Sequence, residues 1–419
     1  MEPLLFLAHR IPYPPNKGDK VRSYHLLRHL AGRYRVFLGT FVDDPADWPH
    51  LGKLNELCAG VIAQPLNPTS ASIRSLAGVL SGEALTLPYF RASALQRWVD
   101  QTLKRERIRK CFVFSSAMAQ YVTGRADLRR VVDLVDVDSE KWRQYATERR
   151  WPLAWIYRRE ADHLLAFEEA IAREVDATLL VTTAEEALFV KRAPQIASRV
   201  HVVANGVDTE FFAPETGFER PFPTDEQPIV FTGAMDYWPN ADAACWFATE
   251  VLPAVLRQYE RARFYIVGMN PLHAVQALAR QPAVTVTGRV PDTRPYLQHA
   301  SVVVAPLRIA RGVQNKILEA MAMARPVVAS SACAKSLSAI PGSELLVAGD
   351  ASEFASRVLE VLAVESSSMG KAARARVLSD YQWDRNLSTV DALLGDSPAP
   401  VQPLASVAPA VAGLRGVRS

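Results

Sequence analysis

The most constraining feature of this sequence is the alternation of short apolar runs with longer amphipathic stretches. The short runs indicate buried strands and the amphipathic stretches indicate helices, a pattern typical of βα units around a parallel sheet. The pattern stops in a loop rich in proline and acidic residues, 214–228, and then begins again. The expected strands are 4–8, 36–41, 111–114, 130–134, 178–181 and 201–204 before this loop, and 229–232, 264–267, 284–287, 301–305 and 326–329 after it.

These two series of strands predict an α/β chain with two Rossmann-like domains. We assign residues 1–204 to the N-terminal domain and residues 205–395 to the C-terminal domain, and we allow for the last helix to pack back on the N-terminal domain. Residues 396–419 are rich in Ala, Pro, Val, Gly and Ser and have no aromatic residue, so we expect a disordered tail. A cleft between the two domains is the expected ligand site.

Composition excludes several classes of protein. No apolar run approaches the roughly 20 residues that a membrane-spanning helix needs. Glu2 stands where a signal peptide carries positive charge, so we expect a cytoplasmic protein. A net charge of +4 is too small to indicate a nucleic-acid partner, and we expect none. The spacing of the cysteines fits neither a disulfide framework nor a zinc site, which predicts reduced thiols at Cys58, Cys111, Cys245 and Cys333.

The first expected strand leads into a glycine-containing turn and then into a helix. His9 follows the strand, and Lys17 and Gly18 lie just before the helical pattern. Free backbone N–H groups and the positive end of a helix dipole at such a turn suit a phosphate group. Because the turn is neither G-x-G-x-x-G nor a Walker loop, a plain structural turn stays open as the alternative. Of the histidines, His9 is the best placed to act in the cleft, with a structural role as its alternative.

Two further segments, taken in order, carry a resemblance to a known family. Residues 205–214 read N-G-V-D-x-x-x-F-x-P at the domain junction. Residues 306–322 lead from a strand through a turn with Gly312 into a helix containing L-E-A-M-A, and P-V-V follows at 326–328. The sequence resembles the family-4 glycosyltransferases of the GT-B fold. The resemblance implies two Rossmann-like domains that face each other across a cleft.

The resemblance also implies a donor site in the C-terminal domain. In that family the acid at the position of Glu319 holds the ribose hydroxyls of a nucleotide sugar, and Lys316 and Gly312 would lie beside the diphosphate at the start of the same helix. The segment that matches Gly288, Arg289 and Val290 touches the base through its backbone in relatives. The expected donor-binding residues are therefore Lys17, Gly18, Gly288, Arg289, Val290, Gly312, Lys316 and Glu319.

Two departures from the family pattern affect the expected chemistry. Arg311 replaces the first glutamate of the usual E-x7-E pattern, which leaves the sugar and the stereochemical outcome open. The loop at 231–242 lacks the Arg and Lys that many relatives use to neutralise the diphosphate, so Lys316, Arg311 and Arg289 would replace them.

Three carboxylates, Asp133, Asp136 and Asp138, lie at and just beyond the end of the strand expected at 130–134, facing the presumed cleft. Asp136-x-Asp138 superficially matches a metal-binding D-x-D motif, but the GT-B fold is that of metal-independent enzymes, so we expect no metal. An acceptor-contacting or helix-capping role is the interpretation that we adopt. The expected catalytic residues are His9, Arg311 and Asp136.

Residues 141–159 interleave aromatic rings with arginine and lysine. Such a segment suits the surface of an anionic membrane, and the alternative is that the rings pack on the N-terminal sheet while the arginines are solvated. A lipid-linked acceptor would explain a membrane contact.

The segments K-G-D-K-V-R-S, D-L-V-D-V-D-S-E-K-W and F-T-G-A-M-D-Y-x-P-N resemble a narrower group, the sugar transferases of PEP-CTERM/exosortase and exopolysaccharide systems, over nearly residues 1–395. This resemblance implies a retaining, metal-independent hexosyltransferase that moves sugar from a nucleotide-diphosphate donor to a glycan or lipid-linked acceptor. We expect no cofactor besides the donor, and a place at the inner face of the cytoplasmic membrane. A nucleotide-sugar epimerase and a non-catalytic scaffold subunit stay open as alternatives.

Overall fold

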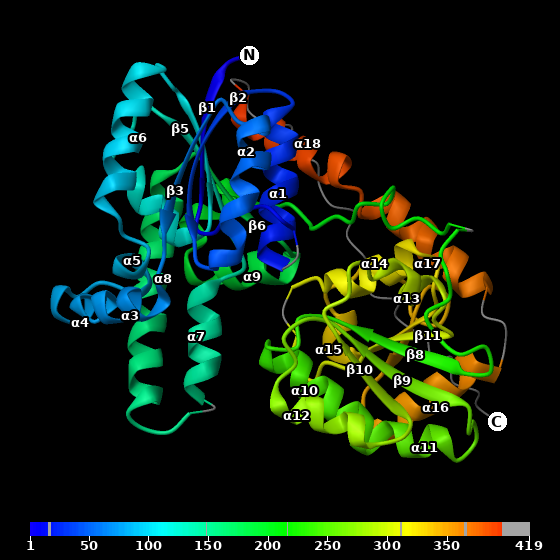
Figure 1. The fold of residues 1–419 in the computed structure, drawn as a ribbon. Helices are drawn as coiled ribbons and strands as arrows, with labels where there is room; N and C mark the ends of the chain where they lie inside the picture. The colour runs from blue at the N-terminus through cyan, green and yellow to red at the C-terminus, as the bar shows by residue number, and fades with distance from the viewer. Residues whose placement is uncertain (16–17, 148, 216, 311, 364–366, 396–419) are drawn as a thin grey trace, which may run out of the picture.

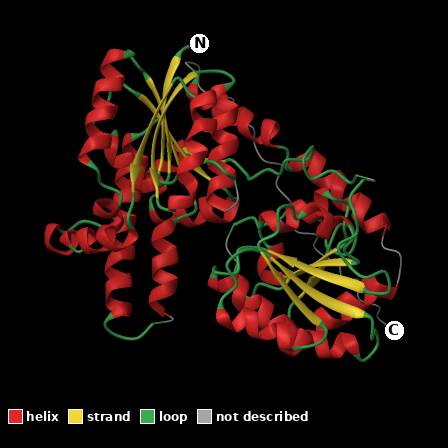
Figure 2. Cartoon of the chain, in the orientation of Figure 1, coloured by secondary structure: helices red, strands yellow, loops and turns green. Residues whose placement is uncertain are grey.

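The computed structural model describes residues 1–15, 18–147, 149–215, 217–310, 312–363 and 367–395. They form two α/β domains, each built on its own parallel sheet (Figures 1 and 2). The expected tail, residues 396–419, lies outside the described residues.

The N-terminal sheet has seven strands in the order β3-β2-β1-β4-β5-β6-β7. They are β1 (Pro3–Ala8), β2 (Arg35–Val42), β3 (Gly60–Pro65), β4 (Lys110–Phe114), β5 (Arg129–Val135), β6 (Ala177–Leu180) and β7 (Val200–Val202). The helices of this part of the chain are α1 (Gly18–Ala31), α2 (Leu51–Leu57), α3 (Pro68–Ser75), α4 (Ala77–Ser81), α5 (Thr86–Tyr89), α6 (Ser93–Arg105), α7 (Asp138–Thr147), α8 (Leu153–Glu174) and α9 (Thr183–Arg192).

The C-terminal sheet has six strands in the order β10-β9-β8-β11-β12-β13. They are β8 (Gln227–Thr232), β9 (Ala262–Val267), β10 (Val284–Gly288), β11 (Val302–Ala305), β12 (Val327–Ser330) and β13 (Leu346–Ala348). The α-helices that follow β8 are α10 (Trp238–Trp246), α11 (Leu252–Leu256), α12 (His273–Ala277), α13 (Arg294–Gln298), α14 (Asn315–Ala322), α15 (Ser331–Ala334), α16 (Ala351–Ala363), α17 (Ser367–Asp380) and α18 (Trp383–Leu394). Short 3-10 helices cover Pro45–His50, Ser116–Tyr121, Pro194–Arg199 and Leu278–Arg280, and Phe247–Val251 forms a π-helical turn.

Burial on both faces explains why the central strands are continuously apolar. In β1, Leu4 and Phe6 belong to one core cluster, whereas Leu5 and Leu7 belong to another. A parallel sheet covered on both sides needs apolar residues at every position of such a strand. A strand is present at every position where the sequence predicts one, and β3 and β13 are additional strands at the sheet edges.

The chain crosses between the two domains twice, after β7 and before α18 (Figure 1). After the second crossing, α18 packs in the core of the N-terminal domain through Trp383, Leu387 and Val390. The two crossings are paired, because the Val207 N–H donates to the Tyr381 carbonyl over 2.8 Å. The hinge is therefore two hydrogen-bonded segments rather than a single linker.

Arg22 of α1 joins this hinge to the N-terminal sheet. Its Nε donates to Asp133 of β5 over 2.7 Å, and both side chains are almost fully buried. Its guanidinium also donates to the Val203 carbonyl over 2.9 Å and to the Asn205 side chain over 3.0 Å. Because an unpaired buried charge is costly, each of these groups holds the others in place.

The cysteines and the apolar helices were both subjects of sequence-based expectations. The four cysteines are free thiols, as predicted. Within the described ranges, no helix is both long enough and apolar enough to cross a bilayer.

Truncating Leu387 tests the contribution of α18 to the N-terminal core. We expect Leu387→Ala to lower the free energy of unfolding by about 2–5 kcal/mol, because a fully buried leucine leaves a cavity. Urea unfolding followed by circular dichroism measures the change. Ser388→Ala, at the next and exposed position of the same helix, is the control and should change little. A Leu387→Ala variant as stable as the control would contradict this packing role.

Candidate functional site

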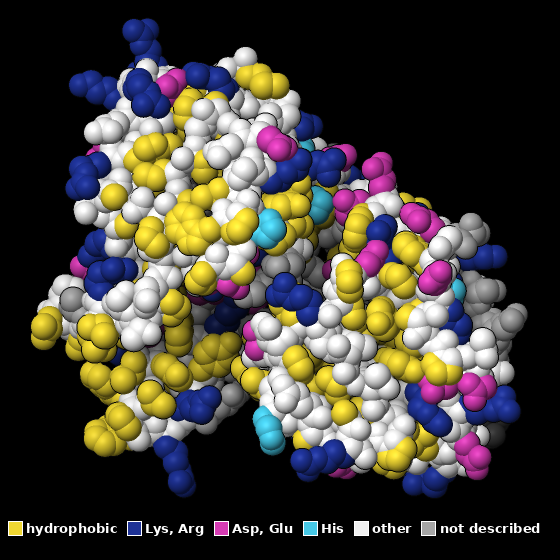
Figure 3. All heavy atoms as spheres, viewed as in Figure 1, with side chains coloured by type: hydrophobic (Ala, Val, Ile, Leu, Met, Phe, Trp, Pro, Cys, Tyr) yellow, Lys and Arg dark blue, Asp and Glu magenta, His cyan; other side chains and the backbone are white. Residues whose placement is uncertain are grey.

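The candidate site lies where loops at the carboxyl ends of the two sheets meet, in the hollow between the domains (Figure 3). Gly312, in the loop between β11 and α14, contacts Asp136, which follows β5: a Cβ atom added to Gly312 would lie 3.2 Å from Asp136 Oδ1. Tyr237, which follows β8, interacts electrostatically with Lys141 and Asp136. Loops of both domains therefore enclose one space.

Lys316, on the first turn of α14, is the cation of the C-terminal side. Its Nζ donates to Asn240 Oδ1 over 2.5 Å and lies 4.7 Å from the centre of the Phe231 ring. Gly233 makes room for this arrangement, because a Cβ there would lie 2.8 Å from the Asn240 amide and 3.1 Å from Lys316 Nζ. Asn240 thus orients the ammonium group without neutralising it.

Glu319 lies three residues after Lys316, on the same side of α14. Within the described residues, no hydrogen bond reaches its carboxylate, which interacts with the Lys316 charge through space. Burial raises the pKa of Glu319 to about 7, although Lys316 opposes the shift. Burial also lowers the pKa of Lys316 to about 8, against the opposing effects of Cys333 and Glu319. A partly buried carboxylate with no hydrogen bond from the described residues is suited to receive hydrogen bonds from a ligand.

Residues 288–290 lie at the same edge of the C-terminal sheet. Gly288 ends β10 with φ +69, a conformation that glycine adopts without strain. Its carbonyl accepts a hydrogen bond of 3.2 Å from the Gly268 N–H, which ties the end of β10 to the end of β9. Arg289 is exposed, whereas Val290 packs against the C-terminal core. The backbone of this segment is therefore fixed at the edge where the donor is expected.

On the N-terminal side, a strained bend presents Asp136. Val135 has φ +71, an unfavourable conformation for a β-branched residue, and its N–H is held by Asp133 Oδ1 over 3.0 Å. Lys141 Nζ lies 2.9 Å from a carboxylate oxygen of Asp136 and 2.9 Å from one of Asp138. Strain of this kind persists where the surrounding structure holds it, and here it turns Asp136 toward Gly312.

His9 and Gly18 lie together in a second part of the N-terminal edge. His9 Nε2 is 3.5 Å from Asp19, which follows Gly18 in the first turn of α1. The His9 ring stacks on Phe114 and meets the edge of Phe90, which fixes its plane. Burial would raise the pKa of Asp19, but His9 and Arg10 hold it well below its usual range. No hydrogen bond or ion pair connects His9 with Asp136 or Gly312 in the part of the chain that the structure describes.

One sequence-based expectation about this edge is wrong. Asp133 does not face the cleft, because it is fully buried and paired with Arg22. Side chains alternate between the two faces of a strand, and this one points into the domain. Lys17 and Arg311, both predicted to act in the site, lie outside the described residues.

Several residues of the site were not singled out from the sequence. Asn240 accepts the hydrogen bond of Lys316, and Asn205 Nδ2 lies 3.5 Å from Asn315 Oδ1 at the start of α14. Glu168 of α8 accepts a 2.6 Å hydrogen bond from the Ser139 hydroxyl, and burial raises its pKa to about 8. A single amide or helix carboxyl gives no sequence signal of its own, although Asn205, Asn240 and Asn315 lie within the resemblance segments.

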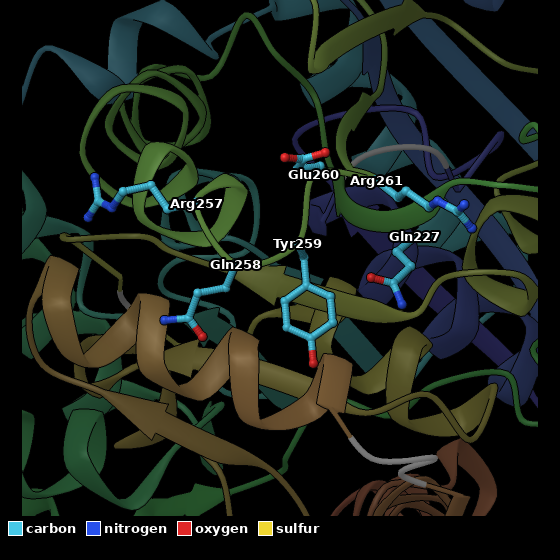
Figure 4. Close-up of a pocket in the computed structure, with 6 residues that line it drawn as sticks. All are labelled: Gln227, Arg257, Gln258, Tyr259, Glu260 and Arg261. Carbon is cyan, nitrogen blue, oxygen red and sulfur yellow. The ribbon is translucent and has the colours of Figure 1, made fainter.

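A pocket of approximately 390 Å³ lies elsewhere, at the opposite edge of the C-terminal sheet (Figure 4). Gln227 begins β8 and Arg261 immediately precedes β9, so the pocket is at the amino ends of these strands. Ligands of parallel α/β sheets bind at the carboxyl ends, and we therefore separate this pocket from the candidate site.

The comparison with protein families decides which family the C-terminal domain resembles. Residues 226–363 match the family Glycosyl transferases group 1. The matched range includes β8, α14 and the Lys316–Glu319 pair, and thus the C-terminal half of the candidate site. No curated protein sequence matches the chain.

Solved structures of glycosyltransferases share the fold of the whole chain. Sucrose-phosphate synthase from Thermosynechococcus elongatus is similar with a TM-score of 0.70 at 19% identity, covering 94% of this chain and 98% of that chain. Anabaena HepE in complex with UDP and glucose has a TM-score of 0.68 at 14% identity, covering 93% and 98%. WaaG, a glycosyltransferase involved in lipopolysaccharide biosynthesis, has a TM-score of 0.64 at 15% identity, covering 94% and 100%. The predicted GT-B fold is confirmed.

The shifted pKa of Glu319 predicts how stability depends on pH. Its pKa is about 7 in the folded protein and near 4.5 in the unfolded chain, so the protonated carboxyl contributes stability below about pH 4.5 that is lost as the pH rises through 7. Glu319→Gln should remove this dependence, and the melting temperatures of variant and wild type should therefore diverge between pH 5 and 7.5. The control is Glu250→Gln, at an exposed carboxylate of the same domain. Parallel curves for wild type and Glu319→Gln would contradict the assignment.

Proposed function

We propose that this protein is a glycosyltransferase that moves a sugar from a nucleoside-diphosphate donor to a glycan acceptor. The observation that carries the proposal is the pair formed by Lys316 and Glu319 on one turn of α14. The ammonium is oriented by Asn240 rather than neutralised, and the partly buried carboxylate has no hydrogen bond from the residues that the structure describes. This combination suits a diphosphate and the two hydroxyls of a ribose.

The donor would lie along the carboxyl edge of the C-terminal sheet. Glu319 accepts hydrogen bonds from the ribose, Lys316 and the first N–H groups of α14 face the diphosphate, and the backbone at 288–290 contacts the base. The proximity of the Gly312 turn to Asp136 of the other domain supports a sugar position between the two. Structures of HepE with UDP and with UDP-glucose make uridine donors the first to test.

In the transfer step, the bond between the sugar's anomeric carbon and the diphosphate oxygen breaks, and a bond to an acceptor hydroxyl oxygen forms. The electron pair stays with the departing diphosphate, where Lys316 and the α14 N–H groups stabilise the negative charge. In the retaining outcome that we propose, the acceptor proton passes to the departing phosphate. His9 and Asp136 contact the sugar and the acceptor from the N-terminal edge.

The cellular setting is also part of the proposal. We propose a lipid-linked acceptor, a role in exopolysaccharide or cell-surface polysaccharide synthesis, and a position at the inner face of the cytoplasmic membrane. Trp142 and Tyr157 of the 141–159 segment pack against each other with ring centres 5.2 Å apart, whereas Trp151 and Trp155 are exposed. The exposed half of the segment supports a membrane contact.

Glu319→Ala tests the donor site. We expect nucleotide binding to weaken by roughly 10- to 100-fold, because a carboxylate that accepts two hydroxyl hydrogen bonds is lost. Thermal shift across UDP-, GDP-, ADP- and TDP-sugars first identifies the nucleotide, and calorimetry then gives the affinities. Glu250→Ala, at an exposed carboxylate of the same domain, is the matched control. A folded Glu319→Ala variant with unchanged affinity would remove Glu319 from the site.

Metal removal tests the proposed chemistry separately. In the proposed mechanism, basic side chains and helix N–H groups take the place of a metal ion. When a membrane lipid extract supplies the acceptor, the rate at which nucleoside diphosphate is released should therefore change by no more than about twofold after chelation with EDTA. Abolished transfer that Mg²⁺ or Mn²⁺ restores would overturn the metal-independent mechanism. Conversion of the donor into an epimer without release of diphosphate would instead indicate an epimerase.

A further inference from the structure

The helical segment formed by α3 and α4 exposes an apolar stripe. Ile73, Leu76 and Leu80 recur at intervals of three and four residues, so they share one side of this segment. That side faces solvent, with Leu76 58% and Leu80 93% exposed. A helix on a protein surface ordinarily turns its apolar side to the core. This stripe is therefore a candidate contact surface.

A second apolar group lies at the turn between α7 and α8. Trp151 is 83% exposed, and Leu153 and Trp155 on the first turn of α8 are exposed as well. Figure 1 shows α7 and α8 projecting together beyond the sheet, with their connection at the end of the projection. Among the described residues, these three side chains belong to none of the N-terminal core clusters.

Two partly buried sets of hydrogen bonds hold the two apolar groups beside each other. The Arg159 guanidinium of α8 donates to the Gly78 carbonyl over 2.7 Å and to the Glu83 carbonyl over 3.0 Å. Glu160 accepts hydrogen bonds from the backbone N–H groups of Leu85 and Thr86. Arg159 lies six residues after Leu153, which is about 9 Å along the helix axis. The α3–α4 segment is thus fixed on α8 close to its exposed end, and Figure 3 shows apolar side chains gathered over this region.

The charge of the two segments is predominantly positive. Residues 68–81 and 149–158 contain four arginines and no acidic residue, and Glu148 precedes the second range. Arg149, Arg150 and Arg158 are exposed, and none of them has an ion pair within the described residues. Apolar side chains beside unpaired arginines match the interface of an anionic bilayer, in which rings and aliphatic groups enter the headgroup region and cations meet lipid phosphates.

We propose that α3–α4 and the α7–α8 turn form one membrane-docking surface, comprising Ile73, Leu76, Leu80, Arg149, Arg150, Trp151, Leu153, Trp155 and Arg158, that binds an anionic bilayer. The inference rests on the proposed membrane contact of 141–159 and adds α3–α4 as its second element. A second copy of the chain is a poorer occupant, because an isologous interface would bring arginines against arginines. Docking here would hold the N-terminal domain at the membrane and leave the C-terminal domain free.

Vesicle sedimentation of the full-length protein tests the surface. Wild type should bind vesicles of phosphatidylcholine and phosphatidylglycerol in equal parts, and bind phosphatidylcholine alone at least roughly tenfold more weakly. The double variants Leu76→Ser/Leu80→Ser, Trp151→Ser/Trp155→Ser and Arg149→Ser/Arg150→Ser should each weaken binding to the mixed vesicles by roughly tenfold or more.

Matched controls distinguish binding by this surface from nonspecific hydrophobic or electrostatic binding to vesicles. Ile340→Ser removes an apolar side chain that is 51% exposed on the C-terminal domain, and Arg257→Ser/Arg261→Ser removes two exposed arginines beside the pocket of Figure 4. Both controls should bind mixed vesicles as wild type does. A donor-induced thermal shift equal to that of wild type would show that each variant is folded. A variant that keeps this shift but loses vesicle binding has an intact donor site, so the two proposals can fail independently.

Three results would overturn the proposal. One is wild-type protein that stays in the supernatant with mixed vesicles. The second is a Leu76→Ser/Leu80→Ser variant that binds as wild type does, which would exclude α3–α4. The third is a wild-type protein that is a dimer in light scattering, together with a Leu76→Ser/Leu80→Ser variant that is a monomer but binds vesicles as wild type does. The surface would then be covered by a second copy of the chain.

Discussion

The buried ion pair between Arg22 and Asp133 fixes three parts of the molecule at once. It joins α1 to the interior strand β5, its second guanidinium nitrogen reaches the hinge at Asn205, and Asp133 also holds the bend at Val135. Removing one partner of such a pair leaves a buried charge unpaired, so neither side chain can move alone. The position of the N-terminal edge of the candidate site, where Asp136 lies, is thus tied to the position of the hinge. The Arg22–Asp133 ion pair therefore contributes both to the stability of the N-terminal domain and to the position of Asp136.

Contacts across the cleft connect the same interaction with the C-terminal domain. Asn205 faces Asn315, the first residue of the helix that carries Lys316 and Glu319. The chain from Arg22 through Asn205 to Asn315 therefore links the N-terminal core with the start of α14. On the other side, Asp136 meets the Gly312 turn that precedes that helix. A ligand held by Lys316 would lie between these two contacts, and closure of the domains would bring both edges to it.

The strongly patterned elements and the resemblance segments could be predicted from the sequence, and the remaining features depend on tertiary context. The edge strand β3 is only partly buried and contains Gly60, Gln64 and Pro65, so it lacks the continuous apolar pattern of β1. Asp133 was expected in the cleft because its neighbours Asp136 and Asp138 lie beyond the strand, but its place within β5 turns it inward. Asn240 gave no signal of its own, since an amide reveals its partner only when the fold brings Lys316 to it.

The paired crossing of the chain between the domains has a mechanical consequence. Two segments that run side by side, bonded through Val207 and Tyr381, resist twisting and sliding but can flex together about a single line. If the cleft opens by flexing at this pair, the motion would be a rotation about that line, and it would keep the two edges in register. With such a connection, the two edges of the candidate site would be aligned by the hinge itself.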